Sequence, residues 1–171
     1  QGAGAKWLSG VIFSLPGIAF VMMAGLWTRL GERKGFTRVI PLALTLTGLA
    51  AIALSFAGSV GSFAATYFVM GMFVAALRPN AGALIATGVE QSFQGMAFGM
   101  QQSAFNVGGF LGPVFAGILG GVIGSKWLFT AIGVSLLLGA FWLYRMIVRL
   151  RTSAALPESR EAAHEAAVGR L

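Results

Sequence analysis

The sequence contains no cysteine and very few acidic residues. Five acids stand against twelve lysines and arginines, with a single histidine. The lack of cysteine excludes disulfides, thiolate catalysis and cysteine-based metal sites. Glu32 and Glu90 are the only acids near the apolar segments and both lie in breaks between them, so the chain offers no carboxylate pair and no Ser/His/Asp set. We therefore predict that it is not an enzyme and that it holds no metal or cofactor.

Charge of either sign is too scarce for a domain that folds in water. Only 10% of the 171 residues are charged and 57% are hydrophobic, and the mean hydropathy is +0.82. A soluble fold of this length cannot bury so much apolar surface, so the expected solvent is lipid. Apolar runs of at least about 18 residues predict membrane spans. Five occur, at residues 7–27, 39–57, 63–89, 96–123 and 127–147.

These runs predict an all-α, polytopic transmembrane helix bundle over residues 1–151, followed by a polar cytoplasmic tail over residues 152–171. Basic residues gather between residues 28 and 38 and again between residues 145 and 151. By the positive-inside rule both clusters are cytoplasmic, which places the N-terminus outside and the C-terminus inside a plasma (inner) membrane. The net charge of +7 therefore reports orientation in the bilayer, and we expect no nucleic-acid partner.

Small residues recur through the fourth apolar run. Gly108, Gly112, Pro113 and Gly117 lie on one face or on a neighbouring row of a helix. Glycines at such spacing let helix backbones approach closely in lipid, and a proline inside a helix removes a hydrogen bond and introduces a kink. We expect a smooth helix-packing face that bends.

Polar residues interrupt the third and fourth runs and are the candidates for a substrate cavity: Arg78, Asn80, Gln101, Gln102 and Asn106. If the third span continues to Glu90, Arg78 lies twelve residues from that end, about 18 Å along a helix, and faces a cavity. If the span ends at Leu77, the following segment is a loop or re-entrant and Arg78 lies at the interface. The glutamines and Asn106 either bind a ligand or bridge helices.

The segment "RLGERKGFTR" resembles the loop motif that joins the second and third helices of each half in major facilitator superfamily transporters. The residues that take motif positions are Leu30, Glu32, Arg33, Gly35 and Arg38. Thr28 stands where the motif has a glycine, and Glu32 replaces an aspartate.

A second segment, "GGFLGPVFAG", resembles the G-x-x-x-G-P-x-x-G-G signature of drug antiporters, with Ala116 in place of one glycine. Residues 79–113 are similar throughout to bacterial multidrug exporters of the drug:proton antiporter branch, and the resemblance extends over residues 8–150. Tyr67 and the stretch "MQQSAFNVGG" favour helices eight to twelve of the C-terminal half over helices two to six.

The resemblance implies a partial major facilitator fold that exports small amphipathic or cationic molecules by alternating access, driven by the proton gradient. Glu32 and Arg33 would then form a cytoplasmic latch. Because Gln1 stands in place of a methionine, we expect a larger protein whose missing half is a partner, alongside the bilayer and the small-molecule substrate. A sugar or metabolite exporter of the same fold, and a five-helix membrane subunit that transports nothing, remain alternatives.

Overall fold

The computed structural model describes the backbone of residues 3–168 and the side chains of residues 7, 10–12 and 14–150. Within this range every regular element is a helix: α1 (Ala3–Lys34), α2 (Phe36–Ser55), α3 (Val60–Val74), α4 (Leu77–Gly88) and α5 (Gln91–Val168). The all-α prediction is therefore confirmed. Residues 152–168 of the predicted tail belong to the end of α5, and the side chains from residue 151 onward lie outside the described range. The cytoplasmic location of the tail stays a prediction.

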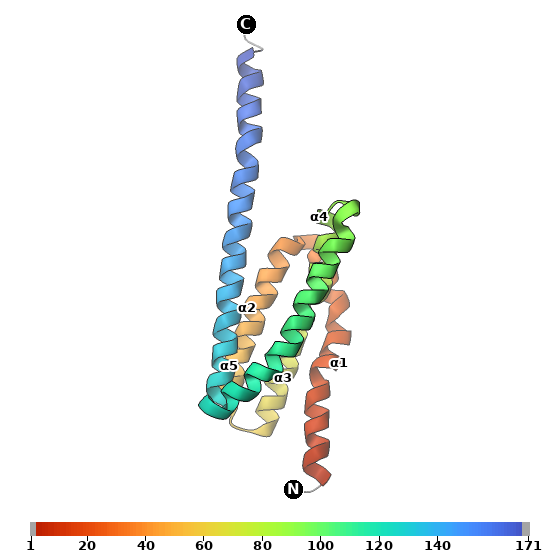
Figure 1. Cartoon of the computed structure of the whole chain (residues 1–171), viewed down its shortest axis with the longest axis vertical. Coiled ribbons are helices and arrows are strands. Elements are labelled where there is room, and N and C mark those ends of the chain that lie inside the picture. The colour runs from red at the N-terminus through yellow and green to blue at the C-terminus, as the bar shows by residue number, and fades with distance from the viewer. Residues whose placement is uncertain (1–2, 169–171) are drawn as a thin grey trace.

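α5 is two helices joined at a sharp kink. Gly124 has φ 80° and ψ 157°, a backbone conformation that only glycine adopts without strain. Figure 1 shows α5 reversing direction, so that it contributes a first arm, residues 91–123, and a second arm from residue 125 onward. The apolar part of α5 is 60 residues long, whereas one crossing needs about 20.

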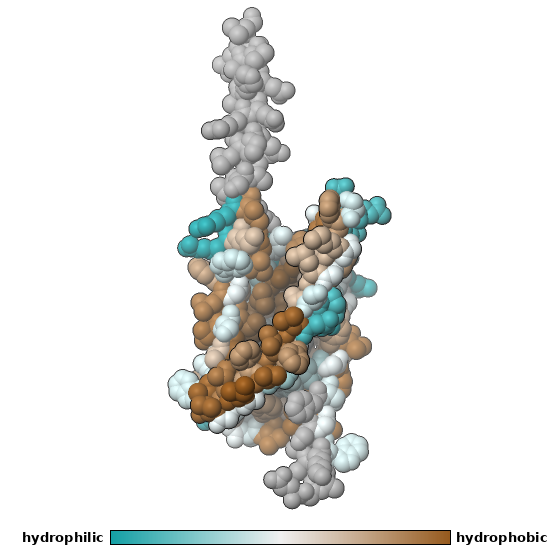
Figure 2. All heavy atoms as spheres, viewed as in Figure 1, coloured by the Kyte–Doolittle hydropathy of each residue, from teal (hydrophilic) through white to brown (hydrophobic). Residues whose placement is uncertain are grey.

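The other apolar helices are also long enough to span a bilayer. Residues 10–34, 36–55, 60–88 and 91–150 qualify by length and composition. The chain is thus a multi-pass membrane protein (Figure 1), and residues 60–88 form its third pass. The count of five spans stays a prediction. Figure 2 shows the apolar outer surface that such a protein presents to lipid.

The third pass is broken between α3 and α4. The N–H groups of Ala75 and Ala76 donate to Gly71 O at 3.0 Å and to Phe73 O at 3.1 Å, so the second bond is one residue shorter than an α-helical bond. Pro79 has no N–H to donate to the carbonyl of Ala75, which explains why the regular ladder stops there. The segment after Leu77 is nevertheless a helix and not a loop.

The backbones of α2 and the second arm of α5 pack closely together. A Cβ added to Gly133 would lie 2.7 Å from Gly48 O and 3.0 Å from Ile52 N. The residues around the crossing are small, or have their polar groups hydrogen-bonded. Ala50 and Ala51 are buried, and the buried Thr47 hydroxyl donates to Ala43 O at 2.7 Å. Close backbone contact, with Ile52 and Leu137 packed onto the two glycines, holds these helices together.

We expect Gly133→Ala to lower the free energy of unfolding by about 1 to 3 kcal/mol, because the new methyl meets backbone atoms that cannot rotate away. The control is Gly139→Ala on the same helix, where the added Cβ meets nothing within 4 Å and helix propensity improves. Thermal unfolding of both variants in detergent measures the difference. Equal unfolding temperatures would contradict close packing at this crossing.

Candidate functional site

One residue joins α1 to α2. Gly35 has φ 88° and ψ 130°, which a residue with a Cβ cannot adopt without strain. Its N–H donates to Gly31 O at 2.8 Å and closes the last turn of α1. This backbone geometry explains why the loop motif has a glycine at position 35.

The charged members of the motif surround this turn. Glu32, Arg33 and Arg38 are exposed, and Leu30 is half-buried. Across the range whose side chains are described, no ion pair joins Glu32 or Arg33 to another residue. The latch expected from these charges therefore has no partner here and stays a prediction.

Asn80 lies against the turn, at the start of α4. Its side chain has no exposed surface, and its Nδ2 donates to Ala76 O at 2.7 Å. The Oδ1 packs on Gly31, where a Cβ would collide with it and with the ring of Phe36. This oxygen has no hydrogen-bond partner among the described atoms. Asn80 thus fills the contact between the α3–α4 break and the α1–α2 turn.

This contact also sets the height of Arg78. Two helical residues rise about 3 Å, so Arg78 lies close to the level of Gly31 and the basic turn. Figure 1 shows α4 continuing past that turn, and much of the separation between Arg78 and Glu90 is helix that lies beyond it. An arginine at this height can reach the interfacial region.

The exposed side chain of Arg78 crosses to the first arm of α5. Its guanidinium carbon lies 4.6 Å from the centroid of the Phe105 ring. A cation over an aromatic face gains about 0.5 to 2 kcal/mol, depending on how much water is excluded. Arg78 therefore ties α4 to α5 through Phe105.

Phe105 lies among the predicted polar residues of the first arm. Gln102 Nε2 donates to Asn106 Oδ1 at 3.1 Å, and both side chains are exposed. Gln101, one helical turn before Phe105, is half-buried. The structure thus brings Arg78 to the segment that carries this amide set and keeps Asn80 apart from it. Ligand binding by any of these residues stays a prediction.

The small-residue face of the first arm has no neighbour in the described part of the chain. A Cβ at Gly108, Gly112 or Gly117 would meet nothing within 4 Å. Pro113 lies in helical backbone, and the non-helical residue of α5 is Gly124. The close approach and the bend expected from this motif therefore also stay predictions.

An apolar crevice between α1 and α3 was missed by the sequence analysis. Its walls come from both helices: Met23, Leu26, Trp27, Leu30, Met72 and Phe73. Trp27 Nε1 donates to Met72 O at 2.8 Å, and its ring meets Phe73 edge-on at 6.4 Å. The spacing of Met23, Trp27 and Leu30 on one helix face is the signal that could have indicated it.

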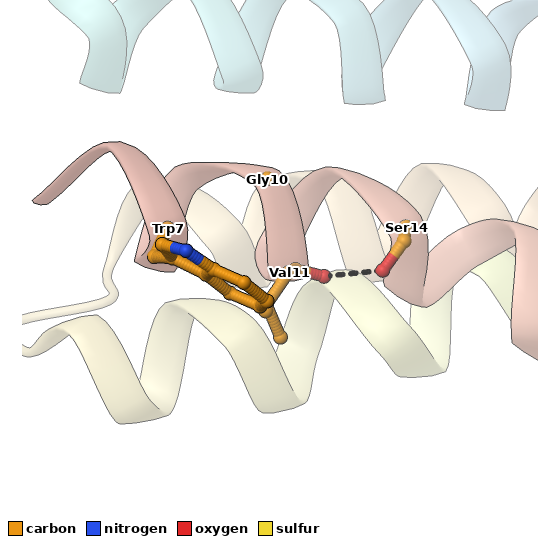
Figure 3. Close-up of a pocket in the computed structure, with 4 residues that line it drawn as sticks. All are labelled: Trp7, Gly10, Val11 and Ser14. Atoms are coloured by element: carbon orange, nitrogen blue, oxygen red, sulfur yellow. Dashed lines mark hydrogen bonds between the residues drawn. The ribbon is translucent and has the colours of Figure 1, made fainter. Parts of the chain in front are cut away.

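A hollow near the start of α1 is a weaker candidate. Figure 3 shows that Trp7, Gly10, Val11 and Ser14 all come from one helix. The Ser14 hydroxyl donates to Val11 O at 2.8 Å and is already satisfied. With no polar groups converging from separate elements, this hollow lacks the features of a ligand site.

We predict that Gly31→Ala will displace Asn80 or Phe36 and lower the unfolding free energy by about 1 to 3 kcal/mol. The matched control on the same helix is Gly25→Ala, where a Cβ meets open space. Unfolding in detergent should separate the two variants by several degrees. If Gly31→Ala unfolds like the control, the contact between α4 and the turn is not a close one.

Comparison with known proteins agrees with this architecture. A family model described as Major Facilitator Superfamily matches residues 5–169. Similar curated proteins include the Multidrug resistance protein MdtG of Salmonella arizonae, of Salmonella paratyphi B and of Salmonella newport, each 26% identical over 144 residues. These alignments cover 84% of this chain but 36% of each relative, so the chain spans about a third of the relatives' length. No solved structure matches.

Proposed function

Since the chain belongs to the Major Facilitator Superfamily, we propose that it works, together with further helices, as a proton-driven exporter of small amphipathic or cationic molecules. The observation that carries this proposal is the crevice of methionine and aromatic side chains between α1 and α3. Aromatic faces attract organic cations, and flexible thioethers adapt to apolar ligands of different shapes. The relatives named above are called multidrug resistance proteins, which supports the same substrate class.

Alternating access needs elements that can change their arrangement. We propose that the break at Ala75 and Ala76 serves as the hinge of the third pass, because its backbone ladder is already interrupted. The exposed charges of Glu32 and Arg33 would then pair with helices outside this chain in the state closed to the cytoplasm. Protons would act on acids elsewhere in the transporter, since Glu32, at the end of α1, is the one acid within the described spans.

A sugar or other polar metabolite is the second candidate substrate. The exposed amides of Gln102 and Asn106 use one hydrogen bond between them and keep further donors and acceptors free for hydroxyl groups. Export of a polar solute in place of an organic cation would favour this reading.

In cells producing the full-length protein, efflux of a fluorescent organic cation should stop when a protonophore collapses the gradient. Arg78→Leu should slow efflux about tenfold, because it removes the charge held over Phe105, and Arg78→Lys should retain more activity. Efflux rates at matched membrane abundance measure this, with Arg149→Leu as the control. Absence of protonophore-sensitive efflux from the unmodified protein would refute the proposed function, whereas an active Arg78→Leu variant would remove only the role of Arg78.

Membrane orientation can be tested because the chain has no cysteine. Lys34 at the α1–α2 turn and Gly58 between α2 and α3 are both exposed, and they lie at opposite ends of α2. We expect an impermeant maleimide to label Lys34→Cys only from the cytoplasmic side and Gly58→Cys only from outside. Labelling of both from one side would contradict the proposed topology.

A further inference from the structure

A groove runs between α2 and the second arm of α5, on the side of the Gly48–Gly133 crossing that faces the basic turn. Arg38, Leu42, Leu137, Phe141 and Tyr144 are among its walls. It is separate from the crevice between α1 and α3 and from the contact of Arg78 with the first arm. The export proposal makes no use of it.

The end of the groove nearest the turn is positively charged. Arg38 is exposed, and in the part of the chain with described side chains it meets no carboxylate. The guanidinium of Arg145 lies 5.2 Å from the ring centroid of Phe141, which is itself part of the groove wall. Arg38 thus lines this end of the groove beside the exposed Tyr144, and Arg145 lies next to it through Phe141 without lining the groove itself. No described acid lines the groove.

The rest of the groove is apolar and open to the side. Leu42 is 49% exposed and Phe141 is 59% exposed. The Thr45 hydroxyl donates to Pro41 O at 2.9 Å, so its donor is satisfied without a ligand. An occupant must therefore be apolar along the groove and anionic at one end.

The groove fits within one leaflet of a bilayer. Its α2 wall runs from Arg38 to Thr45, seven residues later, which corresponds to about 10 Å of helix. The hydrocarbon core of a bilayer is about 30 Å thick, so a groove that begins with a charge at the interface and ends before the crossing lies inside one half of it.

We propose that this groove binds one anionic phospholipid. Its phosphodiester lies between Arg38 and Arg145, where guanidinium groups donate paired hydrogen bonds to phosphate oxygens. One acyl chain follows Leu42 and Leu137 toward the crossing. Basic pockets between helices at the cytoplasmic side suit such headgroups, and a lateral opening admits a lipid directly from the bilayer.

The full chain, carrying Leu42→Cys labelled with bimane, provides the test, with lipids brominated on the acyl chain as quenchers. Brominated phosphatidylglycerol should reach half-maximal quenching at a several-fold lower fraction of lipid than brominated phosphatidylcholine. Arg38→Gln and Arg145→Gln should each raise that fraction about fivefold for phosphatidylglycerol. Neither should change quenching by phosphatidylcholine.

Two controls separate this site from general attraction to a charged surface. Arg29→Gln removes the same charge from α1, and bimane at Leu138→Cys reports from an exposed position of α5 outside the groove. Arg29→Gln should leave the preference for phosphatidylglycerol at Leu42→Cys unchanged. Bimane at Leu138→Cys should be quenched equally by the two lipids. Equal quenching by both lipids at Leu42→Cys, an equal effect of Arg29→Gln, or the same preference at Leu138→Cys would overturn the proposal.

Discussion

Backbone hydrogen bonding inside lipid is the constraint on which this structure depends. With no water to satisfy exposed N–H and C=O groups, each span must form its own ladder of bonds, and any interruption has to be met by another group. Besides the loops at residues 56–59 and 89–90, the chain interrupts its helices at Gly35, at Ala75–Ala76 and at Gly124. Two of these interruptions reverse the chain direction and fall where spans end. The one at Ala75–Ala76 falls inside a span. There a side chain donates a hydrogen bond to a backbone carbonyl.

That side chain is Asn80. Its Nδ2 and its own N–H both donate to Ala76 O, at 2.7 Å and 3.4 Å, so the side chain supplements a long backbone bond in the first turn of α4. The amide oxygen is then turned toward Gly31, where only a glycine leaves room for it. The first turn of α4 and the position of the loop motif are therefore coupled through a single residue. A change in the α3–α4 geometry would move the group on which the α1–α2 turn rests.

Much of the fold follows from the sequence because hydrophobicity in lipid is a strong and local signal. The apolar runs and the breaks near Gly35 and Gly124 could be located without a structure. The surroundings of Asn80 could not, because they depend on which residue of α1 lies at the same height as the start of α4. The crevice around Trp27 was missed for a related reason, since an apolar face toward lipid and an apolar face toward a neighbouring helix have the same composition.

The two sets of glycines show where sequence reasoning stops. Gly48 and Gly133 bring two backbones into contact, whereas Gly108, Gly112 and Gly117 meet no other described residue within 4 Å, although all five are small residues in apolar helices. In water the large side chains beside the open set, such as Phe110 at 71% exposed and Val122 at 80%, would demand burial. In lipid they do not, because hydrocarbon solvates them as well as protein does. Small-residue spacing therefore shows where a close approach is possible, and van der Waals contact with a particular neighbour decides whether it occurs.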